Sequence, residues 1–178
     1  MLAKKPGPAL WAGFFTFQNI GVSFMYMEIR DITKEAVLIP EDGTFRDAIA
    51  LMMKEHTNSL LVVGDDGVLT GEVNVSDLLD AIIPTHLDGD KVLAQLGTEE
   101  LFQIAVKDAE DKEVREFMNV DFQSVHVDDS LITIAGTAIA HQTAHIPIVD
   151  QDDRPIGVIS RRGLKHILAK YLGIRDNT

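Results

Sequence analysis

The sequence predicts a mixed α/β (α+β) fold of two β-α-β-β-α repeats related by a pseudo-two-fold axis. The pattern between residues 39 and 79 returns 86 residues later without a gap, so that Thr57 matches Thr143 and Gly71 matches Gly157. Each copy also has the same order of apolar and polar segments. One copy is too small to bury its apolar faces alone, so the two copies should pack on each other. A ligand would then sit in the cleft between them.

The first half of the first copy predicts a strand followed by a helix. Residues 37–39 form a short apolar run, and an acidic turn follows. Thr44 has the position of a helix N-cap, with Asp47 three residues later as in a capping box. The apolar residues after it repeat at helical spacing and are expected to face the core. They are Phe45, Ala48, Ile49, Met52 and Met53.

The second half of the first copy predicts two strands and a closing helix. Residues 60–63 are a continuous apolar run, which is typical of a strand buried on both faces. A Gly-Asp-Asp-Gly turn at 64–67 should join this strand to a second one at 71–73. A helix over 76–83 should end before Pro84, because proline cannot continue a helix.

The second copy predicts the same elements. Strands are expected at 124–127, 146–149 and 157–159, and helices over 130–141 and 161–172. Between the copies, residues 85–118 are rich in Leu, Glu, Lys and Ala and predict two helices that meet near Gly97. The expected organisation is an extension (1–26), a first repeat (27–84), a helical insert (85–114), a second repeat (115–172) and a tail (173–178).

Residues 8–27 form an uncharged segment after two lysines, with about the length of a membrane span. The polar pair Gln18 and Asn19 lies in its middle, and Leu, Ile and Val are few. We therefore interpret the segment as a leader that packs on the body, or as an extension ahead of a start near Met27. A membrane anchor or signal peptide is the alternative.

The composition excludes several classes of function. A net charge of -12 and a pI near 4.8 argue against nucleic acids and anionic membranes, which require a basic face. There are no cysteines, so disulfides, thiolate zinc sites and cysteine nucleophiles are excluded. His141 and His145 have a metal-ligand spacing but no third ligand, so no metal is expected. No Walker loop, dinucleotide fingerprint, nucleophile elbow or kinase signature is present. We expect a cytoplasmic protein that is not an enzyme.

The chemistry is expected at the strand-to-helix junction of each copy. A small residue, Gly71 or Gly157, would let a ligand approach the strand closely. Asn74 or Ser160 at the helix start can contact a phosphate, which the helix dipole and the free N–H groups also favour. Asp77, three residues after Asn74, could accept both hydrogens of a ribose diol. The flanking apolar strands would hold an aromatic base.

These junctions, the apolar runs 60–63 and 146–149, and the openings 29–32 and 115–118 resemble tandem cystathionine-β-synthase (CBS) domains. The resemblance covers roughly residues 27–172. It implies a Bateman module, usually a homodimer, which binds adenosine nucleotides or related ligands and regulates a protein partner rather than catalysing a reaction. The candidate ligands are AMP, ADP, ATP and S-adenosylmethionine, and no cofactor is required.

Neither junction matches the complete Ser/Thr-x-x-Asp pattern of ligand-binding members. The first keeps the acid, Asp77, but has Asn74 in place of the hydroxyl, while the second keeps Ser160 but has Gly163 in place of the acid. We expect the Asp77 site to be the better ribose site and the second to be weaker or empty. Glu72 would repel a phosphate unless it faces solvent or shares a cation.

The resemblance and the junction chemistry together give a set of candidate ligand-binding residues. They are Gly71, Val73, Asn74, Asp77, Ser124, Val125, His145, Ile146, Pro147, Gly157, Ser160 and Arg161. The plain structural alternative is that the glycines serve turns and that Asp77 is a helix-terminal charge. Two other functions stay open: a ligand-free dimer that binds partners through the helical insert, and a Mg²⁺-responsive module.

Overall fold

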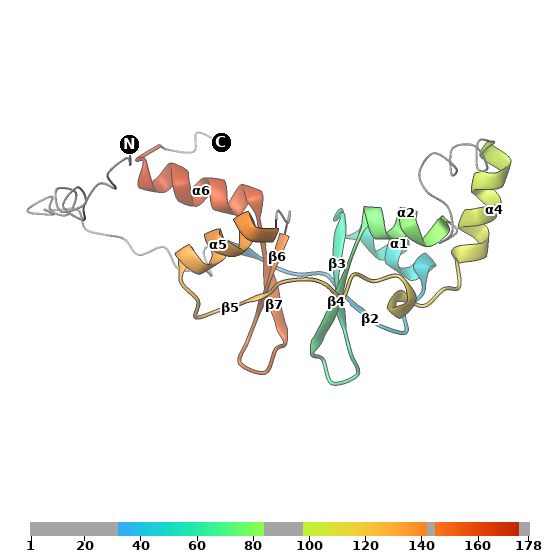
Figure 1. Cartoon of the computed structure of the whole chain (residues 1–178), viewed down its shortest axis with the longest axis horizontal. Helices are drawn as coiled ribbons and strands as arrows, with labels where there is room; N and C mark the ends of the chain where they lie inside the picture. Colours follow the sequence, from blue (N-terminus) through green and yellow to red (C-terminus); the bar gives the residue numbers. More distant parts are fainter. Residues whose placement is uncertain (1–31, 84–97, 142–144, 175–178) are drawn as a thin grey trace, which may run out of the picture.

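The computed structural model describes residues 32–83, 98–141 and 145–174, and it contains the two expected repeats side by side (Figure 1). The first repeat consists of β2 (Leu38–Pro40), α1 (Phe45–Lys54), β3 (Ser59–Val63), β4 (Leu69–Asn74) and α2 (Val75–Ile82). The second consists of β5 (Val125–His126), α5 (Leu131–His141), β6 (His145–Val149), β7 (Pro155–Ser160) and α6 (Arg161–Tyr171). The predicted β-α-β-β-α order is therefore present twice.

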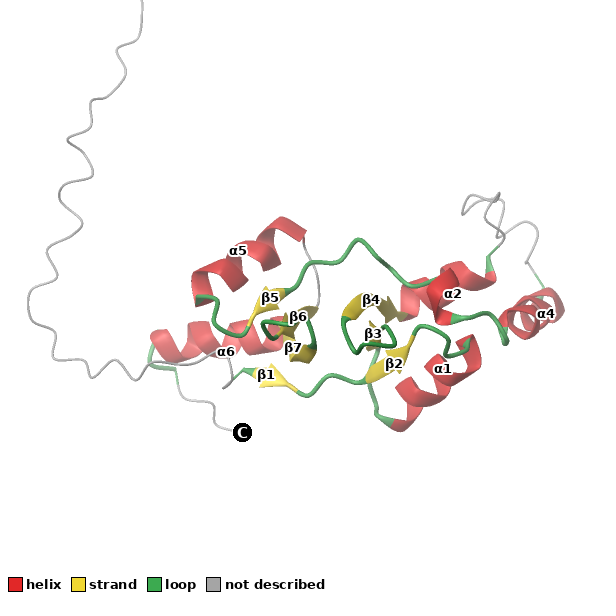
Figure 2. Cartoon of the chain, turned by 90° about the horizontal axis from the view of Figure 1, so that it is seen from below, coloured by secondary structure: helices red, strands yellow, loops and turns green. Residues whose placement is uncertain are grey.

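Each repeat has its own sheet, but the sheets differ in one strand. The first sheet has the order β2-β3-β4 and the second the order β1-β7-β6-β5. The additional strand β1 (Thr33–Lys34) precedes the first repeat in the sequence, yet it pairs antiparallel with β7 of the second (Figure 2). In the opposite direction, Asn119 precedes the second repeat and forms a bridge with Glu72 of β4. Each repeat thus receives a short segment from the chain ahead of the other.

The two junction glycines lie where these segments cross. A Cβ atom at Gly157 would lie 2.4 Å from the carbonyl oxygen of Lys34, and one at Gly71 would lie 2.8 Å from the sulfur of Met118. The close approach that the sequence suggested for a ligand is made at both positions by the chain itself. The lack of a side chain at both glycines therefore allows the crossing segments to pack directly on the two strands.

Helix α1 begins with the predicted capping box. The Thr44 hydroxyl accepts from the Asp47 N–H at 3.1 Å, and the Asp47 carboxylate accepts from the Thr44 N–H at 3.0 Å. The expected core face is partly wrong. Phe45, Ala48 and Met52 are buried, but Ile49 is 36% exposed and Met53 is 72% exposed. Met53 directly follows the buried Met52, and consecutive helical residues point about 100° apart.

Two apolar cores lie within the repeats, and a smaller cluster joins them. Leu61 and Leu69 of the first sheet pack with Val149 of the second, and the Leu69 N–H donates to the Asp153 carbonyl at 3.0 Å. These contacts join the faces of the two sheets that are turned toward each other. Leu61 of this cluster also lines the cleft between the repeats.

The insert contains α4 (Glu99–Ala109), which packs on α2 (Figure 1), and a 3-10 turn, Val114–Glu116. Thr98 caps α4 by accepting from the Leu101 N–H at 3.4 Å. The other expected insert helix and the uncharged segment 8–27 fall outside the described residues. Within the described ranges, no helix has the length and apolar character needed to cross a membrane.

Candidate ligand site between the repeats

A cavity of about 380 Å³ opens between the two repeats. The second repeat contributes His145 at the start of β6, and Val158 and Ser160 of β7. The first repeat and the strand ahead of it contribute residues 34–37, residues 55–59 and Leu61. This volume lies in the range of small-molecule sites. The cavity exists because β1 crosses to the second sheet, since that crossing places Lys34 next to β7.

Ser160 stands at the end of β7, where α6 begins. Its hydroxyl oxygen accepts from the Gly163 N–H at 3.3 Å, which is the geometry of a helix N-cap. A hydroxyl that accepts in this way can still donate its own hydrogen to a phosphate. Ser160 therefore presents a donor to the cavity at the positive end of the helix dipole. Arg161 is the first residue of α6, and its side chain is outside the described part.

Gly163 stands where the family pattern has an acid, and the fold gives a reason. A Cβ atom at this position would lie 3.2 Å from the carbonyl oxygen of Ile32, the residue before β1. The crossing segment thus takes the space that a longer side chain would occupy. The second junction keeps its helix-capping hydroxyl and lacks a carboxylate for a ribose diol.

His145 is half-buried in the cavity wall. Burial lowers the pKa of His145 below its ordinary value, and the positive charge of Lys34 lowers it further. The imidazole is therefore neutral at pH 7. A phosphate dianion beside it would favour the protonated form and raise its pKa.

This shift predicts a pH dependence for the affinity of any phosphorylated ligand that would bind beside His145. Between the lowered pKa of free His145 and the raised pKa of the complex, binding takes up a proton, so affinity should increase as pH falls. We expect AMP to bind several-fold more tightly at pH 6.5 than at pH 8 by calorimetric titration. Below about pH 6 the phosphate itself takes up a proton, which limits the gain. The dependence should vanish for His145→Gln and for adenosine, and its persistence in either would contradict this role.

His56 lines the cavity in a strained backbone conformation. Its φ is 51°, in the left-handed region that normally favours glycine. It follows α1, and the next N–H, that of Thr57, donates to the Met52 carbonyl at 3.1 Å, closing the helix as in a Schellman motif. Strained residues of this kind gather at binding sites.

We expect His56→Gly to raise the free energy of unfolding by up to about 1 kcal/mol, because glycine adopts this φ without a Cβ penalty. AMP affinity should fall in the same variant, because the imidazole leaves the cavity wall. His56→Ala is the matched control: it removes the ring and keeps the strain, so affinity should fall without the gain in stability. Urea denaturation and calorimetric titration measure the two effects. A His56→Gly variant less stable than His56→Ala would contradict this reading.

The first junction uses its polar side chains to cap α2. The Asn74 side-chain oxygen accepts from the N–H groups of Ser76 at 2.8 Å and Asp77 at 3.3 Å, and the Asp77 carboxylate accepts from the Asn74 N–H at 2.7 Å. Burial raises the pKa of Asp77, the hydrogen bond from Asn74 opposes this, and the charge of Asp80 adds to it. In the described structure, the Asp77 carboxylate therefore takes part in the cap of α2.

Glu72 adds a second carboxylate at this junction. Its pKa is raised by burial, lowered by the hydrogen bond from the Asn119 amide at 3.2 Å, and raised by the charge of Asp77. Two partly buried carboxylates at one junction oppose the binding of a phosphate. Residues 142–144, which correspond to 56–58 by the repeat, lie outside the described residues.

The other predicted residues divide between strand interiors and the surface. Val73, Val125, Ile146 and Pro147 are buried in the strands, and Ser124 is exposed. Among all the candidates, His145 and Ser160 meet in the described cavity. No group of three or more potential metal ligands occurs in the described part of the chain.

Sequence reasoning missed the first-repeat side of the cavity. Residues 34–36 precede the expected opening strand, which begins at Val37, and residues 55–58 connect α1 to Ser59, the first residue of β3. The polar run His56-Thr57-Asn58 before an apolar strand is a signal that could have been noticed. The route of β1 into the second sheet has no local signal, because it depends on the packing of the repeats.

Comparisons with known proteins agree with this architecture. A family model of the CBS domain matches residues 29–84 and 114–170. The uncharacterized protein MJ1426 of Methanocaldococcus jannaschii is 26% identical over 157 residues, which cover 82% of this chain and 94% of the relative.

Two solved structures with bound ligands share the fold. CBSX2 in complex with AMP is 19% identical, with a TM-score of 0.60 over 82% of this chain and 98% of that one. The CBS domain pair of MJ0100, in complex with 5′-methylthioadenosine and S-adenosyl-L-methionine, is 18% identical, with a TM-score of 0.58 and the same coverage, 82% and 98%.

Proposed function

Because this chain belongs to the CBS-domain family and carries the domain twice, we propose that it is a regulatory module that binds an adenosine-type nucleotide between its repeats and signals occupancy to a partner. Pairs of CBS domains are generally regulatory rather than catalytic, and some bind AMP or S-adenosylmethionine. AMP, ADP, ATP and S-adenosylmethionine are therefore the ligands to test.

The observation that carries the proposal is the cavity at the Ser160 junction. The Ser160 hydroxyl, the α6 N-terminus and the neutral His145 provide hydrogen-bond donors for a phosphate, and Lys34 provides a positive charge. Glu35 and Glu55 also line the cavity, so the phosphate is expected at its Ser160 end. Leu61 and Val158, on the walls of the cavity, provide apolar surface for a base. Because the walls come from both repeats, an occupied cavity would favour one packing of the repeats over others.

A thermal-shift measurement tests the proposal. The protein is first freed of carried-over nucleotide and then melted with each of the four ligands. A ligand at a hundred times its dissociation constant adds about 2.7 kcal/mol, which should raise Tm by about 5–10 °C in a chain of this size. An increase with at least one of them, and none with guanosine monophosphate, is expected. No increase with any of the four would contradict the proposal.

Two alternative functions, a partner-binding dimer and a Mg²⁺-responsive module, predict different experimental results. Helix α4 exposes Leu101, Phe102 and Ile104, an apolar surface for a second copy or a protein partner. A homodimer, which light scattering would detect, is part of our proposal. A dimer that binds none of the four nucleotides would favour the partner-binding module. An increase in Tm with MgCl₂ alone would favour the Mg²⁺-responsive module. A cytoplasmic location also stays a prediction.

A further inference from the structure

The insert covers the helices of the first repeat. Ala109 of α4 is buried in the first core, with Ala105 and Val106 packed beside it. The Lys112 ammonium just after α4 donates to the Ala81 carbonyl of α2 at 2.7 Å. Below this cover Ile82 of α2 is only 7% exposed.

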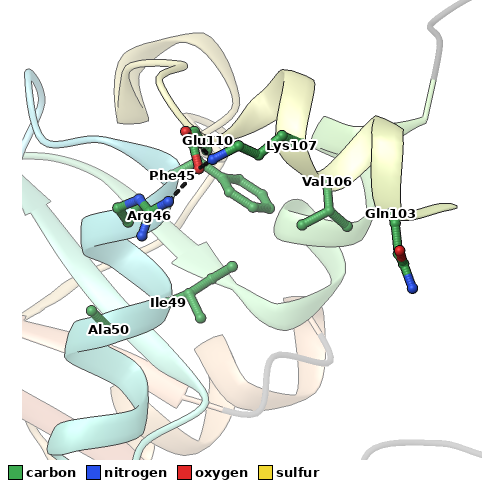
Figure 3. Close-up of a pocket in the computed structure, with 8 residues that line it drawn as sticks. All are labelled: Phe45, Arg46, Ile49, Ala50, Gln103, Val106, Lys107 and Glu110. Carbon is green, nitrogen blue, oxygen red and sulfur yellow. Dashed lines mark hydrogen bonds and ion pairs between the residues drawn. The ribbon is translucent and has the colours of Figure 1, made fainter. Parts of the chain in front are cut away.

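Ion pairs also join α1 and α4. Figure 3 shows Ile49 and Val106 facing each other across a groove, with Arg46 and Lys107 both paired to Glu110 at its edge. The segment that precedes the second repeat thus provides both apolar and ionic contacts to the first.

The corresponding helices of the second repeat are open in the described structure. Leu168 of α6 matches Ile82 by the 86-residue repeat, yet its side chain is 65% exposed. Ile132 of α5 stands in the position of Arg46 and is 80% exposed. Tyr171 and Leu172 extend the same apolar surface. An exposed apolar surface of this kind commonly marks a contact site.

The repeat identifies the segment that would cover this surface. One repeat length before α4 lie residues 13–23, within the uncharged segment 8–27. Phe17, Ile20 and Phe24 fall at i, i+3 and i+7, a spacing that is typical of residues sharing one face of a helix. The second repeat is preceded by its insert helix, and the first repeat is preceded by this segment.

The chain after the segment enters the second repeat. Ile32 is buried in the core of that repeat, and its carbonyl oxygen lies beside Gly163 in the first turn of α6. Leu168 is five residues further along α6, a rise of about 8 Å. Residues 28–31 can span up to about 14 Å, so the segment can reach this surface.

We propose that residues 8–27 pack on α5 and α6 of the same chain, with Phe17, Ile20 and Phe24 against Ile132 and Leu168. The contact is the pseudo-symmetric counterpart of α4 on α1 and α2. The uncharged segment then completes the core of the second repeat.

Cysteine crosslinking in the full chain tests this, because the sequence has no cysteine of its own. The pair Ile20→Cys and Leu168→Cys should form an intramolecular disulfide under mild oxidation. The control pair is Ile20→Cys and Met53→Cys, since Met53 is 72% exposed on the first repeat. We expect the first pair to react at least about tenfold faster than the control. Intermolecular disulfides, or equal rates in both pairs, would overturn the proposal.

Thiol labelling gives a second, independent readout. In a chain with Leu168→Cys alone, the substitutions Phe17→Ser and Phe24→Ser should increase the labelling rate about tenfold. The same substitutions should leave labelling of Met53→Cys unchanged. An unchanged rate at Leu168→Cys would overturn the proposal, as would flotation of the unsubstituted protein with phosphatidylcholine vesicles, which would identify the segment as a membrane anchor.

Discussion

Gly157→Ala is expected to destabilise the protein by about 3 kcal/mol, at the upper end of overpacking substitutions. The new methyl carbon would lie 2.4 Å from the Lys34 carbonyl oxygen and 2.4 Å from the Thr33 Cγ2 atom, so β1 must leave β7. Since Lys34 also lines the cavity, nucleotide binding should weaken together with stability.

Gly71→Ala is the matched control for this prediction. Its nearest obstacle is the Met118 sulfur at 2.8 Å, the end of a flexible side chain, with the Asn119 carbonyl oxygen at 3.2 Å. We expect a cost of about 1 kcal/mol, because the methionine can move. Urea denaturation of both variants measures the difference. Equal losses, or a larger loss for Gly71→Ala, would show that the strand crossing at Gly157 is not the tighter contact.

Ser160→Asp is expected to weaken AMP binding about a hundredfold while the fold is kept. Aspartate caps a helix as well as serine does, so α6 should retain its first turn. Its carboxylate would stand about 5 Å or less from a bound phosphate. At an effective dielectric constant of 20, this repulsion is about 3 kcal/mol, which corresponds to about a hundredfold in the dissociation constant.

Two comparisons separate charge from shape at this position. Ser160→Asn caps the helix without a charge and should bind AMP within a few-fold of the unsubstituted protein. Adenosine, which has no phosphate, should bind to Ser160→Asp and to the unsubstituted protein alike. If calorimetry shows that Ser160→Asp binds AMP normally, the phosphate does not lie at the start of α6.

The repeat made much of the fold predictable. A pattern that returns after 86 residues fixes two equivalent units, and local signals such as the Thr44 capping box and the run 60–63 placed their elements closely. These signals work because capping and strand burial depend on residues close in sequence. The exposed Met53 shows their limit: whether a helical position faces the core depends on which neighbours the fold supplies.

The site was less predictable than the fold for the same reason. Asp77 was expected to give the better ribose site because it keeps the acid of the junction pattern. The hydrogen bonds of Asn74 and Asp77 close a capping box around the start of α2, and ribose binding by Asp77 stays a prediction. The cavity at Ser160 depends on Lys34 of β1 and on residues 55–59 of the first repeat, whereas Ser160 belongs to the second repeat. Only the crossing of β1 brings these groups together, and no local pattern encodes it.

The most direct test is a crystal structure of the full chain with whichever adenosine ligand gives the largest thermal shift. We predict ligand density in the cavity between the repeats, with the phosphate within hydrogen-bond distance of the Ser160 hydroxyl and near Lys34 and His145. Density at the Asp77 junction alone would contradict the location proposed here. A fully ordered but empty cavity at saturating ligand would contradict the proposed binding between the repeats.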